Sequence, residues 1–384
     1  MELVANTTSL ASTLQCPSCG KTYPMHQLQG YATCCQQPLV TRYHLSANKQ
    51  DIAHNVYNMW RYATMLPVLN PDNIVSLNEG WTPIHSLQKI QQRFGRQVLL
   101  KDESVNPTGS FKARGISVAV SKAKELGVTH CIIPTAGNAG GALSAYCAKA
   151  GIKATVIMPR ITPVTLQEEC RMYGAELILV DGLINACGKL ARQMVEETGA
   201  FDMSTLKEPY RLEGKKTIGY ELAEQLQWQL PDVIIYPTGG GTGLIGMWKA
   251  FREMQQLGWI TGKLPRMVVI QTQNCAPMIQ LFEQGKIAPG FQAIPTMAYG
   301  LAVPEPFAKD MMLEVLHHSD GAALTVTEDE IENGMQEMAA TEGLLLSPEG
   351  SATYEGLKKL IEKDWIHQDE TALLFNTGAW YKYR

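Results

Sequence analysis

Short apolar runs alternate with longer stretches of helical spacing from about residue 98 to the end of the chain. Runs that are apolar on both faces are typical of strands in parallel sheets that helices cover. The pattern therefore predicts an α/β fold with one or two open sheets. The strand-like runs are Val98–Leu100, Cys131–Ile133, Ala154–Met158, Leu177–Val180, Val233–Tyr236, Met267–Ile270 and Ala372–Phe375, and the helical stretches include Gly141–Ala150, Val164–Tyr173, Asn185–Glu197, Thr217–Gln227 and Leu244–Leu257.

The helix after the first of these runs begins beside a lysine. A turn-rich segment, residues 106–109, leads to Ser110, which is a suitable N-cap, and apolar residues then recur at helical spacing until Gly127. Lys112 falls in the first turn, where a cation opposes the helix dipole, and this would help to lower its pKa and favour a neutral nucleophile. For a lone lysine, however, a solvated surface position is the usual interpretation.

Two further loops follow predicted strands and precede helices. Residues 134–141 contain small residues that allow a ligand to approach the backbone, together with Asn138, which can donate a hydrogen bond to an oxyanion. An ordinary strand-to-helix turn has the same composition. Residues 237–243 hold four glycines and two threonines before a helix, a pattern that favours a compact phosphate group over a nucleotide, because it matches neither the P-loop nor the Rossmann spacing.

The N-terminal residues differ from the rest. We expect residues 1–45 to form a small extension of short strands and turns. The apolar spacing in residues 46–70 predicts a helix. Cys16 and Cys19 are spaced like one knuckle of a zinc ribbon, but the adjacent Cys34 and Cys35 are a poor geometry for two ligands of one tetrahedral ion. No metal ligand is therefore assigned. A zinc site remains the alternative to a degenerate ribbon without metal, with His26 or His44 as possible substitute ligands.

Composition excludes several classes of function. The 384 residues carry a formal net charge of −4, which argues against a nucleic-acid or acidic-membrane partner. No apolar run approaches the length that spans a bilayer. The first residues lack the basic and apolar regions of a signal peptide and the arginines of a transit peptide, so we expect a cytoplasmic protein.

The segment Asn106–Gly115 resembles the Schiff-base segment of the fold-type II pyridoxal-phosphate enzymes. Along nearly its whole length the chain is similar to the threonine synthase family, whose longer members also carry a Cys-x-x-Cys extension. The resemblance implies two open, mostly parallel, twisted sheets flanked by helices. The other segments that carry it, in family order, are Glu79–Pro83, Ala136–Gly140, Tyr210–Thr217, Gly239–Gly243, Pro348–Gly350 and Phe375–Gly378.

The resemblance implies a role for each site residue. Lys112 would form the Schiff base with pyridoxal 5'-phosphate and move protons, and Asn138 would hydrogen-bond the ring oxygen. Thr377 would face the ring nitrogen, where a neutral hydroxyl leaves the cofactor a milder electron sink that suits elimination and replacement. Thr135 would help to bind the substrate carboxylate, and Arg211 a substrate phosphate, unless Arg211 only forms a surface ion pair with Glu208 or Glu213. The cofactor phosphate would lie in the loop of Gly239, Gly240, Gly241, Thr242 and Gly243.

The implied reaction converts O-phospho-L-homoserine and water into L-threonine and phosphate. The alternatives are a serine/threonine dehydratase, a phosphoserine-dependent β-replacement enzyme and a non-catalytic binding protein. Two segments depart from the shorter family form: Asn138-Ala139, where that form often has Asn-Thr or Asn-Ser, and Ser204–Lys207, where it has Asn-Ser before the arginine. Both departures concern the substrate phosphate rather than the cofactor.

The resemblance also implies a domain organisation. After the extension, residues 46–111 and 216–384 would form a large cofactor-binding domain, and residues 112–215 a smaller inserted α/β domain. A homodimer is expected, because homodimers are common among such enzymes.

Overall fold

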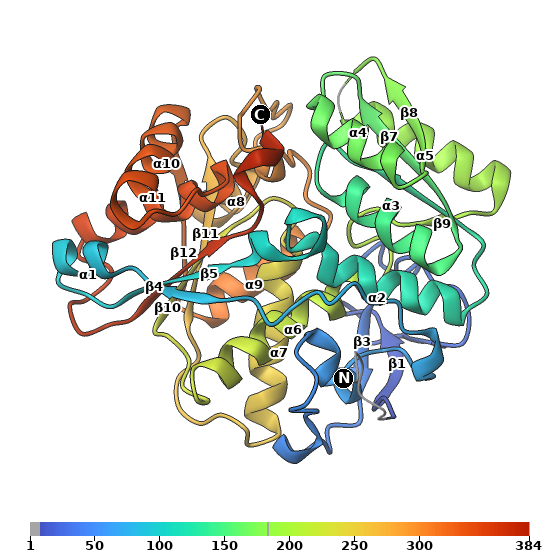
Figure 1. Ribbon diagram of the computed structural model, residues 1–384, viewed down its shortest axis with the longest axis horizontal. Helices are drawn as coiled ribbons and strands as arrows, with labels where there is room; N and C mark the ends of the chain where they lie inside the picture. Colours follow the sequence, from blue (N-terminus) through green and yellow to red (C-terminus); the bar gives the residue numbers. More distant parts are fainter. Residues whose placement is uncertain (1–7, 183, 384) are drawn as a thin grey trace. The chain divides into compact units, whose positions relative to one another are not determined.

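The computed structural model describes residues 8–182 and 184–383 of the chain (Figure 1). Two compact units divide it. Unit 1 comprises Met1–Trp81, Asn106–Glu221 and Gly246–Thr261, and unit 2 comprises Thr82–Val105, Leu222–Ile245 and Gly262–Arg384. The division shows which parts of the chain pack together. It does not test the predicted inserted domain at residues 112–215, which stays a prediction.

Unit 2 is built on a six-stranded sheet in the order β12-β11-β10-β13-β5-β4. All its neighbouring strands are parallel except the edge pair β4 and β5, which is antiparallel. The central strands consist almost entirely of buried aliphatic residues, as parallel strands with two covered faces require. The strands are β4 (Ile84–Ser86), β5 (Val98–Asp102), β10 (Val233–Pro237), β11 (Arg266–Thr272), β12 (Ala322–Val326) and β13 (Ala372–Asn376).

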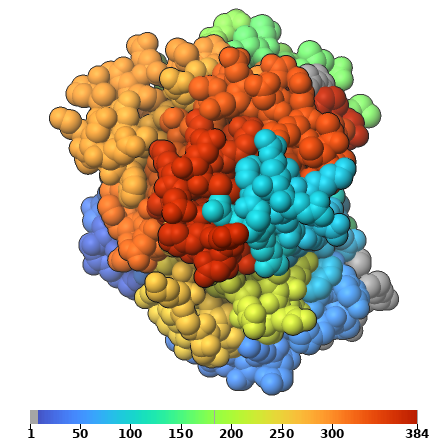
Figure 2. Space-filling view, turned by 90° about the vertical axis from the view of Figure 1, so that its left-hand side faces the viewer, coloured from blue at the N-terminus to red at the C-terminus, as the bar shows by residue number. Residues whose placement is uncertain are grey.

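Helices cover this sheet. Helix α11 packs against β10, β11, β12 and β13, while α8 and α9 pack against β12 and β11. The backbone of α1 donates to Glu342 at the end of α10, and the two helices adjoin as cyan and orange surfaces in Figure 2. The helices of unit 2 are α1 (Gln88–Phe94), α8 (Pro277–Gln284), α9 (Lys309–His318), α10 (Glu328–Glu342) and α11 (Pro348–Glu362), and it includes the first residues of α7 (Thr242–Gln256) and the last of α6 (Tyr210–Gln225).

Unit 1 contains a second parallel sheet in the order β8-β7-β6-β9. Helices α3 and α5 pack against β6 and β7, and α2 packs against α3. The elements are α2 (Lys112–Glu125), β6 (His130–Pro134), α3 (Ala139–Ala150), β7 (Lys153–Pro159), α4 (Val164–Met172), β8 (Glu176–Val180), α5 (Ile184–Thr198) and β9 (Phe201–Asp202). The α/β class with two open, mostly parallel sheets and flanking helices is thus confirmed.

The N-terminal extension belongs to unit 1 and forms a small antiparallel sheet in the order β2-β1-β3. Its strands are β1 (Ala11–Gln15), β2 (Thr22–Tyr23) and β3 (Val40–Tyr43). Leu14, Met25 and Leu39 are buried in the same apolar cluster as residues of α2 and α3. The prediction of short strands and turns in the described part of residues 1–45 is therefore confirmed.

The prediction of a helix over residues 46–70 is wrong. This segment contains only short 3-10 turns, at Lys49–Asp51 and Met59–Met65. Tertiary hydrogen bonds hold the second turn, because the Met59 amide donates to the Glu79 carbonyl oxygen and the Trp60 indole donates to the Glu79 carboxylate. The apolar spacing reflects contact with the core of unit 1 rather than one face of an α-helix.

Glu79 itself is fully buried in unit 1. Its carboxylate accepts hydrogen bonds from Trp60 Nε1 at 2.8 Å, Tyr146 Oη at 2.6 Å and Ser117 Oγ at 2.5 Å. Several donors can satisfy a buried carboxylate that would otherwise be costly. Glu79 therefore joins the chain before residue 81 to α2 and α3.

Among the residues that the structure describes, none of the helices combines the length and the hydropathy needed to cross a bilayer.

Candidate active site

Lys112 is the first residue of α2, so its predicted place in the first turn is confirmed. The preceding turn takes a left-handed backbone at Thr108 and Gly109, with φ of 58° and 61°. The Ser110 hydroxyl accepts from the Lys112 amide at 3.4 Å, but the helix begins after Phe111 rather than directly at Ser110. The half-buried Lys112 amine lies 3.9 Å from the centroid of the Phe111 ring. This aromatic face can stabilise the protonated amine.

A second lysine shares that ring. The Lys215 amine lies 4.0 Å from the Phe111 centroid and donates to the Phe111 carbonyl oxygen. Lys215 is almost fully buried, although lysine is seldom buried without a partner. The sequence interpretation gave it no role, and its only signal was its position in the segment Tyr210–Thr217.

The start of α2 is held by a buried ion pair. Arg114 Nη1 and Nη2 donate to the two carboxylate oxygens of Glu221 at 2.8 and 2.9 Å, and both side chains are fully buried. Glu221 also accepts from the Trp81 amide at 2.7 Å. Because Arg114 is two residues from Lys112, this bidentate pair fixes the turn from which the lysine projects.

The loop with Thr135 and Asn138 connects β6 to α3 in the same unit. Thr135 is buried, and its hydroxyl accepts from the Gly137 amide at 3.1 Å, while Asn138 immediately precedes the helix. A Cβ added to Gly137 would meet nothing within 4 Å, so open space adjoins this backbone. At Gly140, by contrast, packing requires the absence of a side chain, because a Cβ there would lie 2.6 Å from the Met158 side chain. Only part of this loop therefore leaves room for a ligand.

Arg211 is buried at the start of α6. Its Nη1 donates to the Met203 carbonyl oxygen at 2.8 Å and to Thr205 Oγ1 at 3.4 Å, while its Nε lies 4.0 Å from a Glu208 carboxylate oxygen. Burial lowers the pKa of Arg211 below its ordinary value. The expected alternative of a surface ion pair is wrong in one respect, because the partner Glu208 is fully buried. Binding of a substrate phosphate by Arg211 stays a prediction.

A Glu208→Gln substitution is expected to reduce the pH dependence of stability between about pH 4 and 7. Burial raises the pKa of Glu208 to about 7, despite the attraction of Arg211 and two backbone hydrogen bonds. The unfolded chain releases this proton near pH ~4.3. The stability that comes from protonated Glu208 is therefore fully present below about pH 4 and is lost as the pH rises through 7, a change of roughly 4 kcal/mol.

Urea unfolding of both proteins at several pH values between 5 and 8 measures this effect. Glutamine can still accept the hydrogen bonds from the Tyr210 and Arg211 amides, so the variant should gain stability relative to the wild type as the pH rises. Glu196→Gln, at an exposed position of α5, serves as the control. A constant difference between Glu208→Gln and the wild type across this range would contradict the prediction.

The glycine-rich loop lies in unit 2, between β10 and α7. It contains Thr238, Gly239, Gly240 and Gly241, and α7 begins at Thr242, which is 7% exposed. Gly241 has a φ of +79°, a backbone conformation that favours glycine. A Cβ on Gly243 would lie 1.9 Å from Tyr236 Oη. The loop is thus packed tightly from behind, and the start of a 15-residue helix supplies N–H groups and a dipole suited to a phosphate.

Thr377 lies at the same edge of this sheet. Strands β10 and β13 are parallel, with Ile235 paired to Leu374, so Thr377 follows its strand where the glycine-rich loop follows β10. The preceding Asn376 is fixed, because its Oδ1 accepts from the Ser347 amide and its Nδ2 donates to Asp102. The edge beyond the carboxyl ends of strands is where ligands bind in open α/β sheets.

Each unit by itself contains groups that are chemically suited to pyridoxal phosphate. Unit 2 supplies a helix N-terminus with a glycine-rich loop for a phosphate and the buried Thr377 hydroxyl for a ring nitrogen. Unit 1 supplies the half-buried Lys112 amine and the half-buried Asn138 amide. These assignments of individual residues to the cofactor stay predictions.

A Gly239→Ala substitution is expected to weaken binding of pyridoxal phosphate by at least about tenfold. The added Cβ would lie 2.2 Å from the Gly300 carbonyl oxygen, so the loop backbone must move and its N–H groups lose their direction. Titration of the cofactor-free protein, followed by absorbance, measures the affinity. Gly188→Ala in α5 is the matched control, since a Cβ there meets nothing within 4 Å. Unchanged affinity of Gly239→Ala would remove this loop from the phosphate site.

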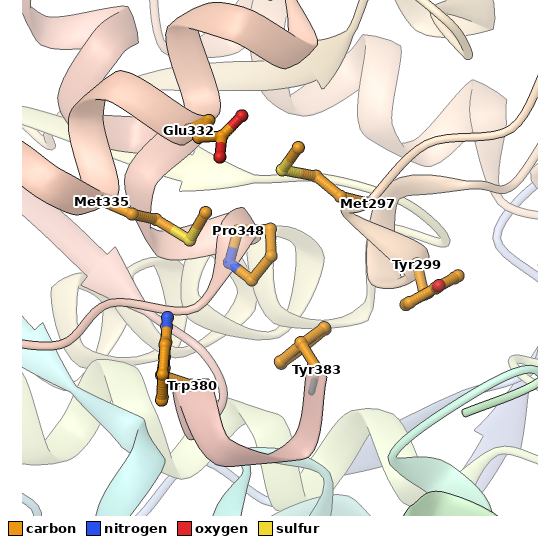
Figure 3. A pocket seen from close by; sticks show the side chains of 7 residues that line it. All are labelled: Met297, Tyr299, Glu332, Met335, Pro348, Trp380 and Tyr383. Atoms are coloured by element: carbon orange, nitrogen blue, oxygen red, sulfur yellow. The ribbon is translucent and has the colours of Figure 1, made fainter. Parts of the chain in front are cut away.

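A separate pocket in unit 2 contains none of the predicted site residues (Figure 3). Its side chains come from α10, the start of α11 and two segments beside them, as the labelled view shows. The neighbouring Gly300 amide donates to Glu349 at 2.7 Å. The pocket is lined by Met297, Tyr299, Glu332, Met335, Pro348, Trp380 and Tyr383.

Comparison with known proteins identifies similar sequences over most of the chain. A family model described as pyridoxal-phosphate dependent enzyme matches residues 75–378. A threonine synthase of Methanocaldococcus jannaschii is 33% identical over 373 residues, which cover 95% of this chain and 91% of that protein. A threonine synthase of Mycobacterium bovis is 31% identical over 319 residues, covering 83% and 86%. The first similarity must also include most of the residues before position 75, which the family model does not match.

Solved structures of related enzymes have the same fold. An L-serine ammonia-lyase from Rhizomucor miehei is similar with a TM-score of 0.68 and 21% identity, over 79% of this chain and 97% of that chain. A maize serine racemase is similar with a TM-score of 0.66 and 22% identity, over 77% and 87%. At this level of identity the similarity concerns the fold.

Proposed function

The chain belongs to the pyridoxal-phosphate-dependent enzymes of fold type II, and we propose that it is a threonine synthase. The proposed reaction takes O-phospho-L-homoserine and water to L-threonine and inorganic phosphate. The observation that carries this proposal is similarity to curated threonine synthases over nearly the whole chain rather than over the cofactor-binding part alone. The enzyme acts on a small amino-acid substrate, and the phosphorylated form is part of the proposal.

Pyridoxal phosphate, the cofactor of this family, supplies an electrophilic carbonyl carbon and a conjugated ring that delocalises an electron pair from the substrate Cα. In the proposed mechanism, Lys112 would hold the cofactor covalently, and its amine would accept the proton from the substrate Cα. The Thr377 hydroxyl is a neutral partner for the ring nitrogen, which suits elimination followed by addition of water. Lys215 lies on the same aromatic ring as Lys112 and can keep a positive charge beside the lysine segment.

A second candidate function is favoured by the contacts of Arg211. One of its guanidinium nitrogens already donates to the Met203 carbonyl oxygen and to Thr205, in a segment that departs from the shorter family form. An arginine bound to its own loop has fewer donors left for a substrate phosphate. A dehydratase of serine or threonine, or a phosphoserine-dependent β-replacement enzyme, would not need Arg211 in the same way.

A substrate comparison separates these functions. The purified protein, loaded with pyridoxal phosphate, is given O-phospho-L-homoserine, O-phospho-L-serine, L-serine or L-threonine, and phosphate, ammonia, keto acid and threonine are measured. We expect equal amounts of phosphate and threonine from O-phospho-L-homoserine. Ammonia and keto acid from L-threonine, without phosphate release from O-phospho-L-homoserine, would replace this proposal by the dehydratase function.

The proposed enzyme is a homodimer. The expected result is a single species of twice the mass of the chain in sedimentation equilibrium. A monomer with full activity would contradict this part of the proposal.

A further inference from the structure

Four cysteine sulfurs converge in the N-terminal extension, in a part of the molecule that the proposed reaction does not use. The Sγ atoms of Cys16, Cys19, Cys34 and Cys35 all lie within 4.8 Å of one another. The sulfurs of Cys19 and Cys34 lie 3.4 Å apart. Among residues 8–182 and 184–383, this is the one group of three or more His, Cys, Asp or Glu side chains that lie close enough to hold a metal. Neither His26 nor His44 belongs to it.

Two tight turns bring these sulfurs together. The first follows β1, where the Cys16 amide donates to the Lys21 carbonyl oxygen at 2.9 Å and the Gly20 amide donates back to Cys16 at 3.0 Å. Gly20 has a φ of +75°, which a residue with a side chain rarely adopts. The Cys-x-x-Cys pair therefore sits on a turn with the geometry of a metal knuckle.

The second turn carries the adjacent pair. Ala32 and Gln37 form an antiparallel bridge that closes it, and Gln36 takes a left-handed φ of 52°. The Cys34 amide donates to the Tyr23 hydroxyl at 3.3 Å, which fixes this turn against β2. Both cysteines of the pair can therefore point to one centre, although their adjacency in sequence argued against it.

The spacing of the sulfurs matches a tetrahedral site. Four thiolates bound to zinc at about 2.3 Å lie about 3.8 Å from one another. The observed separations of 3.4 Å and up to 4.8 Å lie on either side of that value. All nine cysteines are free thiols in the structure, so no disulfide competes for these four.

We propose that Cys16, Cys19, Cys34 and Cys35 bind one zinc ion. A site closed by four protein thiolates leaves no position for a substrate or water, so the ion is structural. Soft thiolate ligands in tetrahedral geometry select zinc over magnesium or calcium.

The ion stabilises the contact between the extension and the rest of unit 1. The strands of the extension have two, five and four residues, too few to form a core of their own. At the end of β3, Tyr43 donates to Glu213 of α6 at 2.7 Å. The Lys216 and Lys249 amines lie 3.7 and 4.6 Å from the Tyr43 ring centroid. Lys216 and Lys249 also pair with Glu213, so Tyr43 lies beside a group of buried charges. Because β3 pairs with β1, zinc that holds β1 to the second turn also keeps Tyr43 in this position.

Metal analysis of the full chain tests the site. The protein is purified without chelator, stripped of metal, and reloaded with zinc chloride, and its metal content and thiol reactivity are measured at each step. We expect about one zinc per chain, with Cys19, Cys34 and Cys35 protected from a thiol reagent until the metal is removed. Absence of zinc after reloading, stoichiometric iron instead of zinc, or a Cys19–Cys34 disulfide in the native protein would each overturn the proposal.

Two cysteine variants test whether zinc binds elsewhere. Cys34 is exposed, so Cys34→Ala removes a ligand without creating a buried cavity, and bound zinc should fall below about a tenth of an equivalent. Cys187→Ala, in α5 and outside the cluster, should retain one equivalent. Stripping the metal should lower the Tm of the wild type and leave that of Cys34→Ala unchanged. Full zinc content in folded Cys34→Ala would overturn the proposal.

Cobalt gives a readout on the wild type that does not depend on any variant. Replacement of zinc by Co²⁺ should produce the visible and sulfur-to-metal absorption bands of a tetrahedral tetrathiolate site, and added zinc should remove them. Octahedral cobalt bands, with no sulfur-to-metal band, would contradict coordination by four cysteines. Since the proposal concerns a metal outside the reaction, failure of the threonine synthase assay would leave these results unaffected.

Discussion

A Lys112→Ala variant is expected to lose turnover of O-phospho-L-homoserine by at least about a thousandfold. The variant lacks the only amine that the sequence places at the start of the helix after Asn106–Gly109, where the family's cofactor-binding lysine occurs. Without that amine, the cofactor is held only by noncovalent contacts, and no group at this position can accept the Cα proton. The yellow colour of the bound cofactor should change as well, because it depends on covalent attachment to the lysine.

Two measurements check this result. Borohydride reduction followed by peptide mass analysis should find the reduced cofactor on Lys112 in the wild type and on no lysine in the variant. Phosphate release should fall in parallel. Lys124→Ala is the matched control, since Lys124 is an exposed lysine on the same helix and donates to the Asp72 carbonyl oxygen. An adduct on another lysine in the wild type, such as Lys215, would show that the assignment of Lys112 is wrong.

An Arg114→Ala variant is expected to lose about 3–5 kcal/mol of stability. The substitution leaves the Glu221 carboxylate buried without its two guanidinium hydrogen bonds, while the contact from the Trp81 amide is retained. Glu221→Ala should cost a similar amount because it leaves a buried guanidinium. In a double variant, Arg114→Met with Glu221→Met, much of this loss should be recovered, since two apolar side chains leave no buried charge.

Urea unfolding, followed by both tryptophan fluorescence and circular dichroism, measures these differences. The matched control is the ion pair of Arg160 and Asp181, whose side chains are 58% and 82% exposed at a separation of 2.6 Å. Arg160→Ala should change stability by less than about 1 kcal/mol, because solvent screens an exposed pair. If Arg114→Ala and Arg160→Ala cost the same, the buried pair does not hold the start of α2.

The seven strands that the sequence predicted are all present. Six of them are apolar runs in which most residues are buried, as in a covered parallel sheet, and the seventh, β8, is a half-buried edge strand. After the N-terminal extension it missed three strands, all at sheet edges, one of which is the two-residue strand Phe201–Asp202. The other two, Ile84–Ser86 and Ala322–Val326, are mostly half-buried, and the first has only three residues. The helical interpretation of residues 46–70 failed for the opposite reason, since apolar residues there contact the core without repeating backbone hydrogen bonds.

The sequence by itself identified the family and its cofactor, through motifs that occur in family order. It also predicted the segments that would bind the cofactor, from local signals: a lysine at a helix start, glycines after a strand and a threonine after the last strand. Only the tertiary structure decided which distant side chains meet. It paired Arg114 with Glu221, directed Arg211 toward its own loop, and placed Lys215 on the ring beside Lys112. It also brought together the sulfurs of Cys16, Cys19, Cys34 and Cys35, which two turns direct to one point. Such contacts join residues that are far apart in the sequence. They depend on how the backbone turns and on which side chains become buried, and the spacing of residues along the chain does not specify either directly.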